Sequence, residues 1–278
     1  MGQNAFDQKK NAILEEINST DLDLSPKGTI DELCLPIMKL INSHRDMVTT
    51  SSCSGRLSVF VEGNKVHNKT VKVGGKGDGG KWLFVTHNQD EVLGWLNNLE
   101  NKNTYFQPIL TPNSTPGSDG STRLILYKYE PFILHVKCRD LESASALYNV
   151  AMSCGFRESG IGSNFIVAIR INIKLDVPIG YVDETTDAYN LLVPLTYIEL
   201  LDQLTFVKFE DNAKKIQYLY NKIENEIINH PIQNVATTQK KEVETKEDRR
   251  IRKRKEGLER QRRALEEKLL KQDTANIV

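Results

Sequence analysis

The chain has 278 residues, with 37 acidic and 37 basic side chains, so its formal charge is zero. This length can bury a sizeable core, and the neutral balance gives no electrostatic case for nucleic-acid binding by the chain as a whole. The N-terminus is polar, and no apolar run approaches the ~20 residues of a membrane span. We therefore expect a soluble, cytoplasmic protein. Its four cysteines are expected to be reduced thiols, and none has a spacing typical of zinc ligands.

Two amphipathic helices are expected first. Apolar residues recur at helical spacing, with charged residues between them, at 6–17 and 29–42. The apolar face of the second helix consists of Leu33, Ile37, Leu40 and Ile41. Residues 47–61 then change character, and we expect two short strands around a small polar turn at 49–55.

The remaining pattern alternates strands with helices. The elements expected in chain order are a glycine-rich hairpin loop at 71–78, a strand at 82–86, a helix at 90–99, a flexible loop at 109–122, strands at 124–128 and 132–138, a helix at 141–154, a strand at 165–173, a loop and strand at 176–193 and one or two helices at 196–228. This order predicts an α+β fold, a compact domain of mixed or antiparallel sheet with packed helices over residues 1–232. Residues 233–278 form a charged tail, helical or disordered, in which Lys and Arg outnumber Asp and Glu.

The segment at 51–56, Ser-Ser-Cys-Ser-Gly-Arg, is the first to combine residue types suited to a functional site. Hydroxyls and free N–H groups in a tight turn anchor carboxylate or phosphate oxygens, and arginine adds a planar fork. A serine-rich turn with a surface arginine is the alternative interpretation. Cys53 could also act as a nucleophile with His87 or His135 as its base, although most free cysteines are packing residues.

Two later segments combine basic residues with groups that bind ligands. Lys81 precedes Trp82, and an aromatic ring beside a cation can stack on a base or an adenine ring. Alternation along a later strand puts His135 and Lys137 on one face, where Arg139 joins them if the strand continues. Three such groups on one face favour a site that faces an anion.

Four motifs follow one another in the chain: S-S-C-S-G-R at 51–56, G-K-W-L-F-V-x-H at 80–87, E-P-F-I-L-H-V-x-C-R at 130–139 and G-F-R-x-S-G-I at 155–161. Over residues 6–229 the chain resembles the wybutosine-synthesizing protein 3 family. The resemblance implies a compact α+β domain that is not a Rossmann methyltransferase. It also implies an enzyme that transfers a methyl group from S-adenosylmethionine to N4 of the tricyclic wybutosine precursor, at the guanosine 3′ of the tRNA-Phe anticodon.

We assign three groups of site residues on these motifs. Donor binding is assigned to Ser52, Ser54, Gly55, Arg56, Trp82, Gly155, Ser159 and Gly160. Contacts with tRNA are assigned to Lys81, Lys137, Arg139 and Arg170. The candidate proton acceptors are His87, His135 and Asp46, and no metal is expected. The chain departs from the family after Arg170, where Ile171, Asn172 and Ile173 stand in place of a Ser-Thr-His-like run, so no role of that histidine is carried over.

Two other functions fit the residues. A non-catalytic RNA-binding module would use the basic tail and a sheet face, and binding of S-adenosylmethionine distinguishes it from an enzyme. A thiol hydrolase would use Cys53, and rapid labelling of this cysteine by a thiol reagent would identify it. For the tail, an element that adds tRNA affinity and a merely solvated charged helix both fit the composition.

Overall fold

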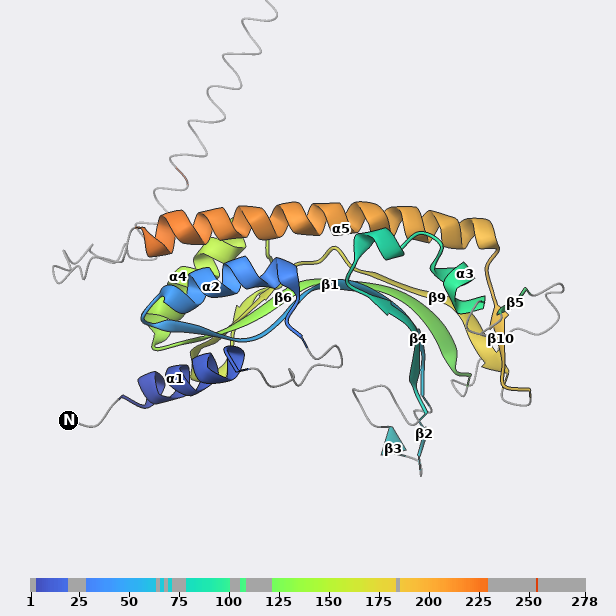
Figure 1. Cartoon of the computed structure of the whole chain (residues 1–278), viewed down its shortest axis with the longest axis horizontal. Coiled ribbons are helices and arrows are strands. Elements are labelled where there is room, and N and C mark those ends of the chain that lie inside the picture. The colour runs from blue at the N-terminus through green and yellow to red at the C-terminus, as the bar shows by residue number, and fades with distance from the viewer. Residues whose placement is uncertain are drawn as a thin grey trace, which may run out of the picture. The chain divides into compact units, whose positions relative to one another are not determined.

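The computed structural model (Figure 1) describes residues 4–19, 29–63, 66–67, 70–71, 79–100, 106–108, 122–183, 186–229 and 254. The chain divides into two units, Met1–Pro231 and Ile232–Val278. Almost all of the predicted loops at 71–78 and 109–122 lies outside the described residues, as does the tail apart from Arg254. Among the described helices, none is both long and apolar enough to cross a membrane.

The centre of the first unit is a sheet in which the described residues form eight strands. Its order is β4-β1-β6-β9-β10-β5, with β8 also paired to β6 and β7 to β8. The strands are β1 Met47–Val61, β4 Lys81–Thr86, β5 Phe106–Pro108, β6 Leu124–Cys138, β7 Gly160–Ile161, β8 Ile166–Arg170, β9 Leu175–Asp183 and β10 Ala188–Leu191, and β2 Val66–His67 and β3 Thr70–Val71 form a separate pair. The β5–β10 pair is parallel and the other pairs in this sheet are antiparallel. The predicted α+β class with a mixed sheet is confirmed.

Helices cover mainly one side of this sheet. They are α1 Ala5–Ile17, α2 Leu35–Ser43, α3 Trp95–Glu100, α4 Leu141–Ser153 and α5 Leu195–Ile223, with short 3-10 turns at Glu32–Cys34, Gln89–Glu91 and Ser163–Phe165 and a π-turn at Glu224–Ile228. In Figure 1 the sheet arches beneath α5, with α2 and α4 on the same side and α1 below it. The face of the sheet away from α5 is therefore concave.

Two hydrophobic cores share the long elements. β6 pairs with β1 along nearly its whole length, but β8 flanks β6 only at Ile133–Lys137 and β9 only at Leu124–Tyr129. The sheet thus has two halves. One core packs α2, α4 and the end of α5 on the first half. The other packs α3 and the start of α5 on the second. Because α5 has 29 residues, about 44 Å at 1.5 Å per residue, it spans both.

A buried asparagine of α5 lies where the two halves meet. Asn212 is 1% exposed, Asn212 Nδ2 donates to Ser54 O at 2.7 Å, and Asn212 Oδ1 accepts from Phe132 N at 2.9 Å. The β1–β6 pairing omits Ser54 opposite Phe132, so the amide supplies the hydrogen bonds that the ladder lacks there. The next pair is Gly55 opposite Pro131, and proline has no N–H to donate.

Gly55 permits this close approach of α5 to β1. Its φ of +108° lies in the region that favours glycine. A Cβ at Gly55 would lie 3.1 Å from Asn212 Nδ2 and 3.3 Å from Glu130 O. Gly55 therefore has a structural role in the chain bend, whatever it contributes to ligand binding.

Several local predictions were wrong. Residues 49–55 are part of one continuous strand, β1, because β6 offers a partner of equal length and this pairing overrides the local turn preference. The strands predicted at 124–128 and 132–138 are likewise one strand, β6. The helix predicted at 29–42 begins only at Leu35 after a 3-10 turn, so Leu33 does not belong to its apolar face and is 50% exposed.

We predict that Asn212→Ala destabilises the domain by about 2–4 kcal/mol, because it leaves the buried Ser54 C=O and Phe132 N–H without partners. Urea unfolding followed by circular dichroism measures the change. Glu210→Ala, at an exposed position of the same helix, is the matched control and should change the free energy of unfolding by less than about 0.5 kcal/mol. Equal stability of the two variants would contradict the role assigned to Asn212.

Asp202 predicts a pH dependence of stability. Its Oδ1 accepts from Trp95 Nε1 and Tyr127 OH, both at 2.8 Å. Burial raises the pKa of Asp202 to about 6 although these two hydrogen bonds lower it. A raised folded pKa gives stability that is fully present below the ordinary value of 3.8 and is lost as the pH rises through 6. Asp202→Asn keeps the hydrogen-bond acceptor but cannot ionise. Its unfolding free energy should therefore rise relative to that of the parent by about 2–3 kcal/mol as the pH increases from 4 to 7. Parallel pH profiles of unfolding free energy for the parent and the variant would contradict this.

Candidate functional site

The edge of β1 opens where β4 leaves it. β4 pairs with β1 only as far as Thr86, opposite Leu57. Beyond this point the segment before α2 approaches the edge, and the Ser54 N–H donates to Asp31 Oδ2 at 2.8 Å. Asp31 accepts the hydrogen bond that another strand could have accepted, which fixes its carboxylate at the sheet edge.

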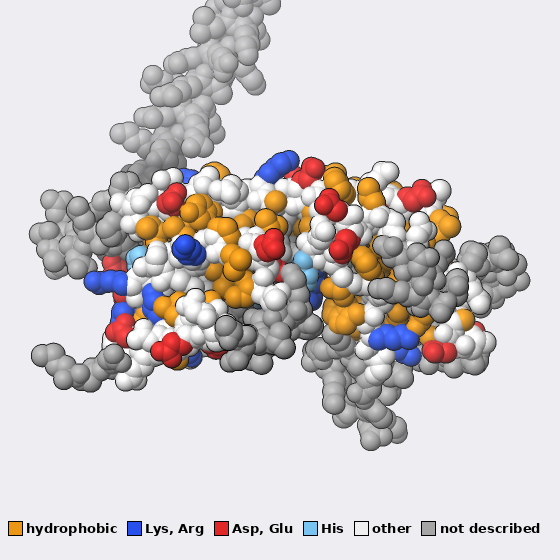
Figure 2. All heavy atoms as spheres, in the orientation of Figure 1, with side chains coloured by type: hydrophobic (Ala, Val, Ile, Leu, Met, Phe, Trp, Pro, Cys, Tyr) orange, Lys and Arg blue, Asp and Glu red, His pale blue; other side chains and the backbone are white. Residues whose placement is uncertain are grey.

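A histidine and a cysteine complete a cluster around this carboxylate. His87 Nε2, just beyond β4, is 3.7 Å from Asp31 Oδ2, and the ligand atoms of Asp31, Cys53 and His87 all lie within 4.8 Å of one another. Figure 2 shows histidine atoms (pale blue) at the surface of this face, with acidic side chains (red) around them. The cluster offers an imidazole base supported by a carboxylate. Among the described residues it is also the group close enough to hold a divalent cation such as zinc.

The environment of Cys53 does not favour a nucleophile. Burial raises the pKa of the Cys53 thiol, and the hydrogen bond from the Gly55 backbone N–H offsets this only in part. Because the thiolate is the reactive form, a thiol held protonated reacts slowly. The cluster does bring His87 within 4.8 Å of Cys53, as the thiol-hydrolase alternative requires, but the raised pKa of the thiol disfavours the thiolate that this alternative needs.

Arg56 and Trp82 form a second part of the site on the concave face. Leu57 and Val59 belong to the core beneath α5, so alternation directs Arg56 to the opposite face. Arg56 Nε donates to Glu130 Oε2 at 2.7 Å, and its guanidinium carbon lies 5.1 Å from the centre of the Trp82 ring. The indole packs on Phe60 at 5.0 Å between ring centres. The pair presents a cation and an aromatic surface together.

Ser58 lies on the same face, between Arg56 and Phe60 in the strand. Within the described part of the chain, its Oγ is a buried side-chain atom with no hydrogen-bond partner, and the residue is 0% exposed. An unsatisfied buried hydroxyl costs roughly 1–3 kcal/mol. Because the residue is fully buried, this hydroxyl lies beneath the Arg56–Trp82 surface and not on it.

The predicted basic residues of β6 and β8 are brought together on the other half-sheet. His135 Nδ1 lies 2.8 Å from Ser51 Oγ, and His135 Nε2 lies 3.4 Å from Arg170 Nη2. Lys137 Nζ donates to Asn164 O. Burial lowers the pKa of His135, and Arg170 lowers it further. At neutral pH the imidazole is uncharged here, while Lys137 and Arg170 carry positive charge.

Arg139 and Asp46 lie in a different environment, where they attach α1 to the sheet. Arg139 Nη2 donates to Asp7 Oδ1 at 2.5 Å and Arg139 Nε to Asp46 Oδ1 at 2.6 Å. Its guanidinium also lies 4.6 Å from the centre of the Phe6 ring. Burial alone would raise the pKa of Asp46, but hydrogen bonds from Arg45 and Arg139 outweigh it and lower the pKa. A carboxylate so paired is a weak proton acceptor, so Asp46 fits that role less well than the two histidines. Arg139 is likewise engaged by α1, apart from the other residues predicted to contact tRNA.

Several residues predicted to bind the donor make structural contacts. Ser52 Oγ donates to Met38 Sδ at 3.2 Å, towards α2. Gly155 ends α4 with φ +89°, where its N–H and that of Phe156 bond to carbonyls of the last turn, a Schellman arrangement. Ser159 Oγ accepts from Arg170 N at 3.1 Å, and Gly160 pairs with Ala168 in the sheet. Lys81, predicted to contact tRNA, lies 5.0 Å from the centre of the Tyr189 ring.

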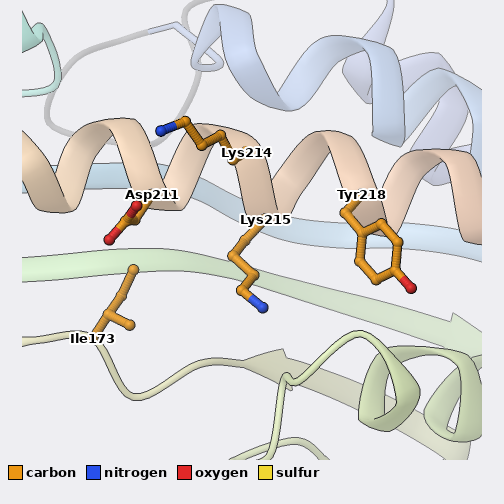
Figure 3. A pocket seen from close by; sticks show the side chains of 5 residues that line it. All are labelled: Ile173, Asp211, Lys214, Lys215 and Tyr218. Carbon is orange, nitrogen blue, oxygen red and sulfur yellow. The ribbon is translucent and has the colours of Figure 1, made fainter.

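A pocket of about 420 Å³ lies beside α5, lined by Ile173, Asp211, Lys214, Lys215 and Tyr218. Figure 3 shows Asp211, Lys215 and Tyr218 pointing from α5 towards the side of Ile173, and Lys214 pointing away. Lys215 Nζ donates to Cys154 O at 3.4 Å, so it caps the end of α4. None of the five was predicted to bind the donor or tRNA.

The sequence missed Asp31 and Ser58. Asp31 looked like an acidic residue in the first turn of a helix, and Ser58 like an ordinary position in a strand. Asp31 is separated from Cys53 and His87 along the chain, so spacing gave no signal for a cluster or for ligands of a metal. Asp31 lies three residues before the buried Cys34, just ahead of the 3-10 turn, and this position carries no sequence signal for a site.

The described residues form an α+β domain whose main sheet is antiparallel except for the β5–β10 pair, unlike the parallel sheet of Rossmann methyltransferases. The chain belongs to the family described as Methyltransferase TYW3, which matches residues 8–225. The family inferred from the four motifs is confirmed. The chain is therefore an enzyme of a methyltransferase family, and its relatives are named for tRNA wybutosine synthesis.

The chain is 60% identical over 261 residues to tRNA wybutosine-synthesizing protein 3 of Saccharomyces cerevisiae, covering 94% of this chain and 96% of that protein. It is 38% identical to the protein of the same name from Schizosaccharomyces pombe, over 80% and 88%. A solved structure from Pyrococcus horikoshii matches with a TM-score of 0.56 at 27% identity, over 80% of this chain and 94% of that one. The 261-residue alignment is longer than residues 1–232, so it extends into the tail, beyond the resemblance seen in the motifs.

Proposed function

We propose that this chain methylates N4 of the tricyclic wybutosine precursor at the guanosine 3′ of the tRNA-Phe anticodon, with S-adenosylmethionine as the donor. Membership of the methyltransferase family and the names of the relatives support the reaction. The observation that carries the assignment of the site is the His87–Asp31 pair at the edge of β1, where Asp31 accepts from Ser54 N and Arg56 follows two residues later in the same strand. A tRNA-modifying role also agrees with the cytoplasmic location expected from the sequence.

The Arg56–Trp82 surface fits the chemistry of the donor. A guanidinium binds a carboxylate, and an indole stacks on an adenine ring. S-adenosylmethionine, when bound, supplies an activated methyl group on sulfur. The protein contributes mainly by holding the acceptor nitrogen in line with that methyl group, which can provide several kcal/mol of the rate enhancement.

The His87–Asp31 pair would remove the proton that the nitrogen loses. Asp31 Oδ2 lies 3.7 Å from Nε2, an ion-pair distance, so the carboxylate would stabilise the charged ring from the Nε2 side and the proton would be accepted at Nδ1. The imidazolium that results would be stabilised by Asp31, which the Ser54 N–H holds in place. Transfer of a methyl group from a sulfonium to nitrogen needs no Lewis acid, so the base role explains the cluster without a metal.

Two substitutions should separate these roles. His87→Gln is expected to slow single-turnover methylation of hypomodified tRNA by about 10²–10⁴-fold and to leave donor affinity unchanged.

Arg56→Ala should leave the fold intact and abolish methylation through loss of donor binding. Mass spectrometry of nucleosides measures the rate, calorimetry the donor affinity, and His44→Gln is the matched histidine control. A folded His87→Gln protein with full activity would refute the base. Absence of donor binding by the parent protein, with tRNA present, would favour the RNA-binding module.

The charged tail is proposed to add affinity for tRNA rather than to take part in catalysis. Removing residues 236–278 should weaken tRNA binding, most strongly at low salt, because fewer counterions are then released from the phosphates. Donor affinity should not change. Filter binding over a range of salt concentrations tests this, and unchanged tRNA affinity at low salt would leave the tail as a solvated segment.

A further inference from the structure

One face of the first half-sheet is only partly covered, because α1 packs on it at the end near Met47 and Arg139. The side chains of β1, β6 and β8 that point away from α2 and α4 include Ser51, Ile133, His135, Lys137, Ala168 and Arg170, and we call this surface the open face. Their neighbours Leu134, Val136 and Val167 point the other way into the core. The open face carries the positive charges of Lys137 and Arg170, and positive charge along a surface is what holds the backbone of a single-stranded nucleic acid.

Phe165 lies at one end of the open face. The residue directly precedes β8, is 38% exposed, and its ring centre is 5.8 Å from Lys137 Nζ. Both Asn164, with φ +55°, and Phe165, with φ +58°, are in the left-handed region. This conformation is uncommon for any residue with a side chain and is rare for a bulky one.

The neighbouring contacts hold this turn in place. Asn164 O accepts from Lys137 Nζ, and Gly162 N donates to Ile166 O at 2.7 Å. The chain therefore keeps an unfavourable backbone conformation that leaves an aromatic ring partly exposed beside a lysine. Strain that the surroundings maintain in this way often marks a functional position.

The other end of the open face reaches the methylation site. Lys137 pairs with Ile166, next to Phe165, and Ile133 pairs with both Arg170 and Cys53. Four residues of strand separate Lys137 from Ile133, about 13 Å. At about 3.4 Å per stacked nucleotide, a few nucleotides of single strand would span this distance.

We propose that the open face binds the anticodon-loop nucleotides next to the methylated guanosine, with a nucleobase stacked on Phe165 and backbone phosphates at Lys137 and Arg170. This inference rests on the proposed function, since it places the RNA relative to that site. Base–aromatic stacking tolerates different bases, because every base has a π face. His135, uncharged at neutral pH, would contribute a hydrogen bond rather than a charge.

Binding of a fluorescein-labelled anticodon stem-loop of tRNA-Phe to the full chain tests the proposal by anisotropy. Phe165→Ala and Phe165→Leu should each weaken binding about tenfold, and Phe165→Trp should retain it, since only tryptophan keeps a stacking surface. None of the three should change the salt dependence of binding, whereas Lys137→Gln should reduce its slope by about one. Tyr197→Ala, at an aromatic residue of α5 that is 37% exposed, is the matched control and should bind as the parent does.

Donor binding, measured by calorimetry on the same variants, distinguishes this inference from the proposed function. Unchanged donor affinity together with weaker RNA binding supports the stacking role. If Phe165→Ala and Phe165→Leu bind RNA as tightly as the parent, the stacking role is wrong, while a parent that methylates tRNA keeps the proposed function. If Phe165→Leu retains the RNA affinity and only Phe165→Ala loses it, the side chain of Phe165 acts only by packing in the turn at 164–165. The inference is then overturned. A parent chain that binds neither the donor nor the stem-loop overturns both.

Discussion

The side-chain amide of Asn212 is the interaction on which the arrangement of the domain depends. It bonds to β1 through Ser54 O and to β6 through Phe132 N, at the point where the two strands do not pair with each other. Since an amide offers one donor side and one acceptor side, it can complete both strands without leaving a buried polar group unpaired. The bend of β1 at Gly55 and the position of α5 over both half-sheets follow from this contact.

The same interruption creates the site. Because β4 pairs with β1 only beyond the bend, the Ser54 N–H at the edge is available to Asp31, and His87 follows β4 to the same place. The two predicted histidines therefore have different surroundings. His87 adjoins a carboxylate, which suits a proton acceptor, whereas His135 adjoins a guanidinium, which disfavours its protonated form. These surroundings favour His87 over His135 as the proposed proton acceptor, two candidates that the sequence did not distinguish.

Local patterns predicted much of the fold. The helices α1, α4 and α5 have clear apolar periodicity, and the end of α4 at Gly155 follows from its glycine. The long strands were missed because polar residues at 49–55 resemble a turn, and only the partner strand makes them extended. At the site, Arg56, Trp82 and His87 came from motifs. Asp31 and Ser58 could not, because their importance comes from neighbours that are distant in the chain.

The sharing of β1, β6 and α5 between the two cores has a thermodynamic consequence. Neither core can lose its long strands or its covering helix without exposing the other, so the two cores should unfold together in one transition. A molecule bound at the edge of one half then raises the melting temperature of the whole domain, because the ligand binds only the folded form. The donor and the RNA would each protect both cores, although the sites proposed for them lie on different halves.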